Sequence, residues 1–87
     1  MKVHVLYHPA SDHARRAEDF AKEFERHSDI KPALLSLETP EGAHAATLYD
    51  VTRYPAILVT EETGDLLKLW QDEQFPLVSE VSYFAHS

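Results

Sequence analysis

The sequence contains no cysteine at any of its 87 positions. Disulfide bonds, catalysis by a thiolate and metal sites built on cysteine are therefore excluded for this chain. It also has no apolar run near the roughly 20 residues that a membrane-spanning helix needs. Residues 1–10 alternate too much between polar and apolar types for a secretion signal. We therefore expect a cytoplasmic protein with no membrane partner.

Basic side chains are scarce in the second part of the chain. Residues 37–87 contain nine acidic side chains but only Arg53 and Lys68 as basic ones, and they carry the whole net charge of −7. The first 36 residues contain six basic and six acidic side chains. Because an acidic surface repels phosphate backbones, we expect no nucleic-acid partner.

Apolar residues recur in seven segments with short connections, without a repeat or a linker. A chain of this length suffices for one domain, so residues 1–87 are predicted to form a single unit. The spacing of the apolar residues, together with the prolines and glycines that interrupt regular structure, predicts strands and helices. The strands are expected over residues 2–7, 33–37, 55–59 and 66–70, and the helices are expected to begin near residues 11, 40 and 76. The predicted order is βαβαββα, an α/β arrangement.

The first predicted helix runs to about His27 with a clear apolar stripe. Ser11 is expected as its N-cap, and Asp12 in the first turn would complement the helix dipole. The stripe recurs at steps of three and four residues and comprises Ala14, Ala17, Phe20, Ala21 and Phe24. Charged side chains fill the opposite face, which is typical of an amphipathic helix on a sheet.

The two later helices carry weaker signals. Thr39 followed by Pro40 predicts an N-cap with proline at the first helical position. That helix is expected to bury Ala46 and Leu48, with Gly42 costing about 1 kcal/mol relative to alanine. The last helix is expected to start at Pro76 and to present an apolar stripe of Leu77, Val78, Val81, Phe84 and Ala85.

The strand over residues 55–59 is almost continuously apolar, which favours a central strand covered on both faces. Residues 61–65 follow it as a turn in which Gly64 can adopt a positive φ. The segment 66–70 then returns beside it as the second strand of a hairpin.

The order βαβαββα at this length resembles the thioredoxin/glutaredoxin superfamily over essentially the whole chain. The segment VTRYPAILV at residues 51–59 is similar to the stretch in which that family opens its third strand with a cis-proline. Proline at the start of a strand leaves the hydrogen-bond ladder intact. The resemblance implies a four-stranded mixed sheet flanked by helices, and a cis peptide bond between Tyr54 and Pro55.

The segment LYHPASDHARR at residues 6–16 lies where the family carries a strand, a short loop, a Cys-x-x-Cys motif and a helix. The two cysteines of that motif would fall on Ser11 and Ala14. Neither position keeps a sulfur atom, so the resemblance implies the fold without the thiol–disulfide exchange.

The resemblance also implies that polar residues lie close together at the place of the missing cysteines, which we call the vacated site. Ser11, His13 and Arg16 would lie near Arg53, Tyr54 and Pro55, with His8 beside them. A helix start and two arginines favour an anionic ligand, such as a carboxylate-bearing peptide or a glutathione-like molecule, which the Tyr54 backbone would pair with in extended form. The alternative is that Ser11 is only a cap and that Arg15, Arg16 and Arg53 are ordinary solvated side chains.

Other chemistry is less well supported by the sequence. His4, His8 and His13 lack the fixed spacing of metal ligands, so we expect no metal and no other cofactor. No motif provides Ser11 with an oriented base, so we expect no catalytic residue. Asp72 and Glu73 lie where glutaredoxins hold the amino group of glutathione, but ordinary solvated charge is the favoured explanation of both.

Two functions remain open from the sequence alone. The first is a redox-inactive binding or protein-interaction module, monomeric or homodimeric, which uses the vacated face or the edge strand at residues 66–70. The second is a small glutathione- or anion-binding domain or enzyme related to the N-terminal domain of glutathione transferases. The absence of an all-helical domain from this sequence favours the first.

Overall fold

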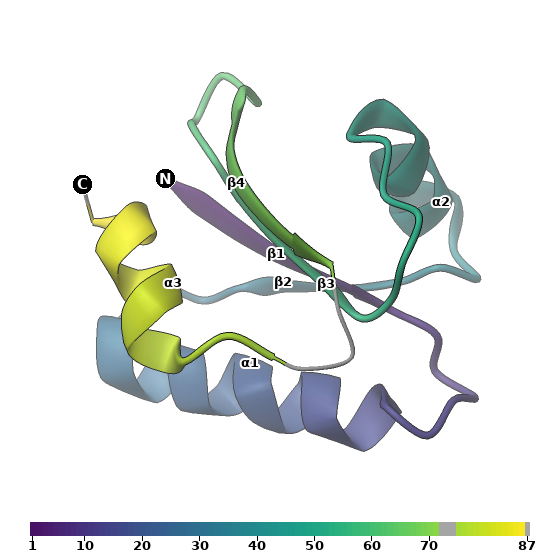
Figure 1. Ribbon diagram of the computed structural model, residues 1–87, viewed down its shortest axis with the longest axis horizontal. Helices are drawn as coiled ribbons and strands as arrows, with labels where there is room; N and C mark the ends of the chain where they lie inside the picture. Colours follow the sequence, from purple (N-terminus) through teal and green to yellow (C-terminus); the bar gives the residue numbers. More distant parts are fainter. Residues whose placement is uncertain (72–74, 87) are drawn as a thin grey trace.

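The protein is described by a computed structural model that covers residues 1–71 and 75–86. Its elements follow the predicted order βαβαββα (Figure 1). They are β1 (Lys2–Tyr7), α1 (Ala14–Ser28), β2 (Ala33–Ser36), α2 (Pro40–Leu48), β3 (Ala56–Thr60), β4 (Leu66–Gln71) and α3 (Val78–Ala85). None of the helices in these two ranges is both long and apolar enough to span a membrane.

The four strands form one mixed sheet in the order β2-β1-β3-β4. β1 pairs parallel to β2 and antiparallel to β3, while β3 and β4 form the predicted antiparallel hairpin. All five residues of β3 are buried, which confirms the prediction of a central strand. Gly64 has a φ of 99° in the turn between β3 and β4, as expected for glycine at this position.

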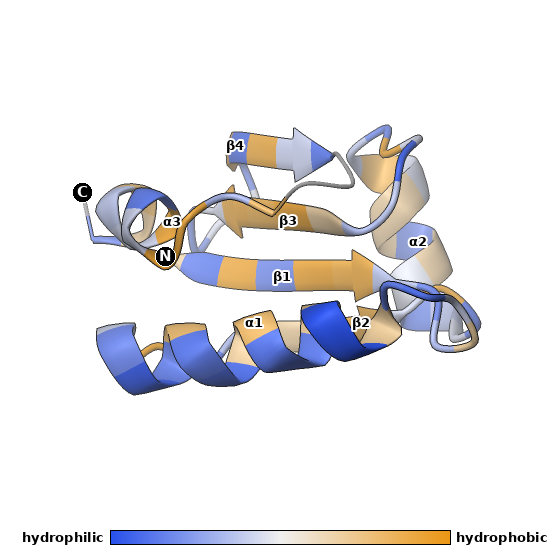
Figure 2. Ribbon diagram, turned by 60° about the horizontal axis from the view of Figure 1, so that its bottom comes forward, coloured by the Kyte–Doolittle hydropathy of each residue, from blue (hydrophilic) through white to orange (hydrophobic). Residues whose placement is uncertain are grey.

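The two faces of the sheet bury separate apolar clusters, because neighbouring side chains of a strand point to opposite faces. On one face, α1 and α3 lie side by side (Figure 1), and Val5, Ile57 and Phe24 are fully or almost fully buried between them and the sheet. On the other face, α2 covers a smaller cluster around Leu6 and Leu58. Figure 2 shows that α1 turns its hydrophilic side away from the sheet.

The start of α1 differs from the prediction. The helix begins at Ala14 with His13 as its N-cap, and His13 makes no side-chain capping hydrogen bond. The Ser11 hydroxyl instead donates to the carbonyl oxygen of His8 at 2.6 Å, which turns it back toward β1. Ser11 is therefore not the N-cap, and Asp12 lies before the first turn rather than within it.

α2 keeps its predicted cap but not its predicted core residues. The Thr39 hydroxyl accepts a hydrogen bond from the Gly42 backbone N–H at 3.1 Å, and Pro40 opens the helix. Ala46 is buried as expected, but Leu48 is 62% exposed. Leu48 is the last helical residue, and the buried side of this short helix is set by Gly42 and Ala46, so the prediction of a buried Leu48 is wrong.

α3 starts two residues later than Pro76, at Val78. Leu77 is its N-cap, with extended backbone, and its N–H donates to the carboxylate of Glu80 at 3.1 Å. A residue with extended backbone does not follow the helical periodicity, and Leu77 is 67% exposed instead of lying in the apolar stripe. Val81 and Ala85 of the predicted stripe are buried.

Candidate functional site

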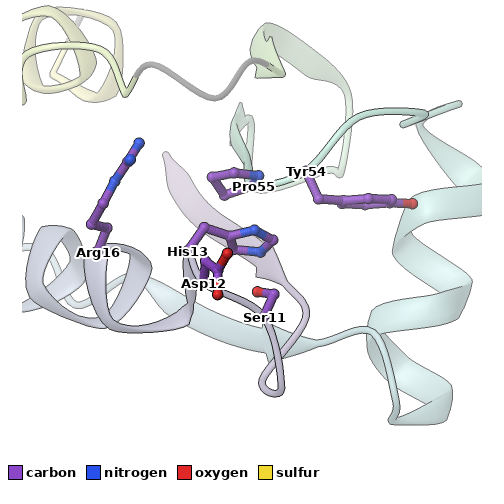
Figure 3. A pocket seen from close by; sticks show the side chains of 6 residues that line it. All are labelled: Ser11, Asp12, His13, Arg16, Tyr54 and Pro55. Carbon is purple, nitrogen blue, oxygen red and sulfur yellow. The ribbon is translucent and has the colours of Figure 1, made fainter.

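Two loops and the first turn of α1 enclose a cavity of about 390 Å³ (Figure 3). One loop connects β1 to α1, and the other leads into β3. The residues that line the cavity are Ser11, Asp12, His13, Arg16, Tyr54 and Pro55. Five of the six residues predicted for this site therefore share one cavity. Arg53 is exposed and does not line it, whereas Asp12 was absent from the predicted set.

The loop between β1 and α1 is closed by its own hydrogen bonds. The backbone N–H of Ser11 donates to the carbonyl oxygen of His8 at 3.2 Å, beside the bond from the Ser11 hydroxyl. The N–H of Ala14 donates to the carbonyl oxygen of Ser11 at 3.3 Å. Together these bonds hold the loop in a compact turn against the start of α1.

His13 connects this loop to the cavity. Its Nε2 accepts a hydrogen bond from the backbone N–H of His8 at 3.1 Å, so the imidazole is neutral and carries its proton on Nδ1. Burial lowers the pKa of His13, the positive charges of His8 and Arg16 lower it further, and Asp12 partly opposes them. The imidazole is therefore held in its neutral form at pH 7.

Arg16 is positioned by a row of aromatic rings that begins in the core. Its guanidinium carbon lies 5.4 Å from the ring centroid of Phe75. Phe75 stacks on Phe20 with centroids 5.4 Å apart, and Phe20 stacks on the fully buried Phe24 at 6.2 Å. A guanidinium over an aromatic face is attracted by the ring, which orients its plane.

The loop before β3 forms the opposite wall. The peptide bond between Tyr54 and Pro55 is cis. The Tyr54 hydroxyl donates to the carbonyl oxygen of Val51 at 3.1 Å, and the His8 and Tyr54 rings pack edge to face with centroids 5.0 Å apart. In Figure 3 the Tyr54 ring extends away from His13 toward α2, and the Pro55 ring lies on the side of Arg16 and His13.

Gln71 at the end of β4 stabilises the loop before β3 through hydrogen bonds to its backbone. Its Oε1 accepts hydrogen bonds from the backbone N–H groups of Thr52 at 2.9 Å and Arg53 at 3.3 Å. A backbone donor that loses such a partner costs about 1–3 kcal/mol if it stays buried and less if water reaches it. Sequence reasoning missed Gln71, because nothing in its neighbourhood shows that a residue 18 positions after Arg53 reaches that loop.

Substituting Gln71 tests this bracing role. Gln71→Ala removes the acceptor and is expected to lower the free energy of unfolding by about 1 kcal/mol, because water satisfies part of the exposed loop. Gln71→Glu keeps an acceptor oxygen at the same place and is expected to stay close to the wild type. Urea unfolding followed by circular dichroism measures both, and equal losses in the two variants would show that the Oε1 bonds are not what holds the loop.

Two further sequence-based ideas concern the surroundings of the cavity. His8 and His13 lie with ring centroids 6.2 Å apart, but residues 1–71 and 75–86 contain no group of three histidine or carboxylate side chains that could hold a metal ion. Asp72 and Glu73, the residues compared with a glutathione amino-group site, lie outside the described residues.

Comparisons with protein-family models and with curated proteins gave no match. A comparison with solved structures matched thioredoxin 1 from the thermophilic eubacterium Thermosipho africanus TCF52B, with a TM-score of 0.72. The match covers 99% of this chain and 91% of that chain, at 14% sequence identity. This chain has a thioredoxin-like fold. At this identity the likeness shows the fold alone.

The loop before α1, where the resemblance places the redox motif, contains no sulfur atom. Ser11 closes the loop before α1 and Ala14 is the first residue of that helix. With no cysteine anywhere in the sequence, this chain supplies no thiol for disulfide exchange. What the site retains is a cavity with one guanidinium, one imidazole and one carboxylate on its walls.

Proposed function

We propose that this thioredoxin-like chain is a redox-inactive binding module, and that its cavity takes the carboxylate end of an extended peptide or a glutathione-like molecule. The observation that carries the proposal is the cavity of about 390 Å³ at the vacated site, with Arg16 and His13 on one wall and Tyr54 and Pro55 on the other. Such a volume lies within the range of small-ligand pockets.

Arg16 favours a carboxylate as the charged group of the ligand. Its planar guanidinium offers paired donors that match a carboxylate, and the Phe75 ring orients it. Asp12 on the same wall opposes an anion, so the ligand group is expected to bind on the Arg16 side of His13. The chain has a net charge of −7, which disfavours anions in general, so binding of an anion here depends on the local positive charge of Arg16.

Tyr54 and Pro55 favour an extended backbone in the ligand. They precede β3, whose register with the neighbouring strands ends at Ala56, so the backbone of this loop lies beyond the ladder of the sheet. The family resemblance implies that the residue before the cis-proline pairs with an extended peptide. Glutathione is a small tripeptide with two carboxylates, and it serves as the test ligand for both features.

The variant Arg16→Gln tests the proposed contact. We expect its dissociation constant for glutathione to rise about tenfold, the equivalent of 1.4 kcal/mol, because the charged hydrogen bonds to the carboxylate are lost. Arg15→Gln is the matched control: it removes the same charge from the next residue of the same helix, and Arg15 does not line the cavity. Chemical-shift titrations measure both constants, and equal weakening in the two variants would show that only general charge matters.

A further inference from the structure

We propose that the cavity takes up a proton together with its carboxylate ligand, and that the imidazole of His13 accepts this proton. The inference rests on the proposed function, since it concerns the same cavity. It assigns the site a ligand affinity that rises as the solution becomes more acidic.

The hydrogen bond from the His8 backbone to His13 ties the free cavity to the neutral imidazole. Nε2 accepts that bond at 3.1 Å, and a protonated imidazole has no lone pair with which to accept it. Protonation of His13 therefore breaks a bond of the closed loop and turns Nε2 into a donor. The cavity then has a second cationic donor beside Arg16.

The charged and titratable groups around His13 come from each element that packs near it. Asp12 precedes it in the loop, Arg16 follows it in α1, His8 faces it from the end of β1, and Tyr54 lies on the opposite wall. Burial, His8 and Arg16 lower the pKa of His13, and Asp12 alone raises it. The neighbours of the free imidazole are thus mostly unfavourable for its positive charge.

A bound carboxylate reverses this balance. Entering between Arg16 and His13, it neutralises the positive charge that lowers the pKa of the imidazole and offers an acceptor to the new Nε2–H donor. The pKa of His13 is then higher in the complex than in the free protein. Between these two pKa values the protein therefore takes up a proton when the ligand binds. Within that interval the affinity rises by up to about tenfold for each unit by which the pH falls.

The two other candidates for the proton fit less well. Protonation of Asp12 would remove a negative charge from the cavity wall but would add no cationic donor for the ligand. The His8 ring packs edge to face with the Tyr54 ring and does not line the cavity. Among the cavity residues, His13 is the one whose protonation adds a charge toward the ligand.

Glutathione titrations at several pH values test the proposal. Between about pH 7 and about pH 5 the carboxyl groups of glutathione stay charged, since such groups titrate at about 3.5, and its amine and thiol stay mostly protonated. Any change in affinity over this range therefore comes from the protein. We expect the wild-type dissociation constant to fall at least about fivefold from the higher to the lower pH, within the limit set by uptake of one proton.

Two variants locate the proton. His13→Gln can still accept the His8 N–H but cannot be protonated, so its dissociation constant is expected to change less than about twofold over the same range, a near-absence of proton linkage. His8→Gln is the matched control: it keeps the backbone N–H that donates to residue 13 and is expected to retain a pH dependence in the same direction, moved to higher pH because the His8 charge no longer lowers the pKa of His13. The NMR signal of the His13 ring is expected to titrate at higher pH with glutathione than without it.

The outcomes separate this inference from the proposed function. Glutathione binding at the cavity with the same affinity at each pH would overturn the proton uptake and leave the binding module intact. A pH dependence that disappears in His8→Gln but persists in His13→Gln would overturn the role of His13. No binding at any pH would overturn both proposals.

Discussion

Replacing Gly42 with alanine is expected to lower the free energy of unfolding by about 3 kcal/mol or more, in the range of severe steric substitutions. Gly42 is buried in the first turn of α2, where the helix meets the end of β2. A Cβ at this position would lie 2.7 Å from the carbonyl carbon of Ser36 and nearer still to its oxygen. These are backbone atoms, which cannot rotate away, so α2 would have to move off the sheet.

This prediction opposes the one from helix propensity, which gives alanine an advantage of about 1 kcal/mol over glycine. Ala43→Gly measures that propensity at the next, exposed position and is expected to cost about 1 kcal/mol. Thermal and urea unfolding of both variants decide the matter. A Gly42→Ala protein as stable as the wild type would show that α2 and β2 do not pack this closely.

Replacing Phe24 with alanine is expected to cost about 3–5 kcal/mol, the usual loss for a large buried aromatic side chain. Phe24 is completely buried in the larger core cluster, between α1 and the sheet. Domains of this kind have about 5–15 kcal/mol of stability in total, so the variant should be close to its unfolding transition at ambient temperature. Phe24→Leu keeps most of the apolar volume and is expected to lose about 1 kcal/mol.

The position of Phe24 also affects the cavity, because the rings of Phe24, Phe20 and Phe75 form one row that ends at Arg16. We expect the Phe24→Leu variant, which stays folded, to shift the NMR signals of Phe75 and Arg16 more than those of Lys22 on the opposite, exposed side of α1. Urea unfolding measures the stability of both variants. A loss below about 1 kcal/mol for Phe24→Ala would contradict a well-packed core at this site.

Much of the fold follows from local patterns in the sequence. The continuous apolar run of β3 predicts a strand buried on both faces, and Thr39 with Pro40 predicts the start of α2, because these signals arise within a few residues. The errors occur where tertiary contacts decide. Gly42 looks like a helix weakness until the approach of Ser36 is known, and Leu77 looks like part of a stripe until its extended backbone places it outside α3.

The candidate site was predicted in outline and not in detail. The family resemblance predicted that the loop before α1 and the loop before β3 lie side by side, and residues of both loops line the cavity. The prediction that Ser11 caps α1 was wrong, because its hydroxyl donates to the carbonyl oxygen of His8 instead. The supports of the site, Gln71 and Phe75, come from distant parts of the chain, and sequence periodicity contains no information about such contacts.

The most direct test of the binding proposal is a titration of the isotopically labelled protein with glutathione, followed through its backbone amide signals. We expect saturable shifts concentrated at Ser11, His13, Arg16 and Tyr54, which line the cavity. Signals of Lys31 and Leu34, which line a separate groove between α1 and β2, are expected to stay unchanged. Shifts confined to that groove, or no shifts at any concentration, would contradict the claim that the vacated site is a binding site.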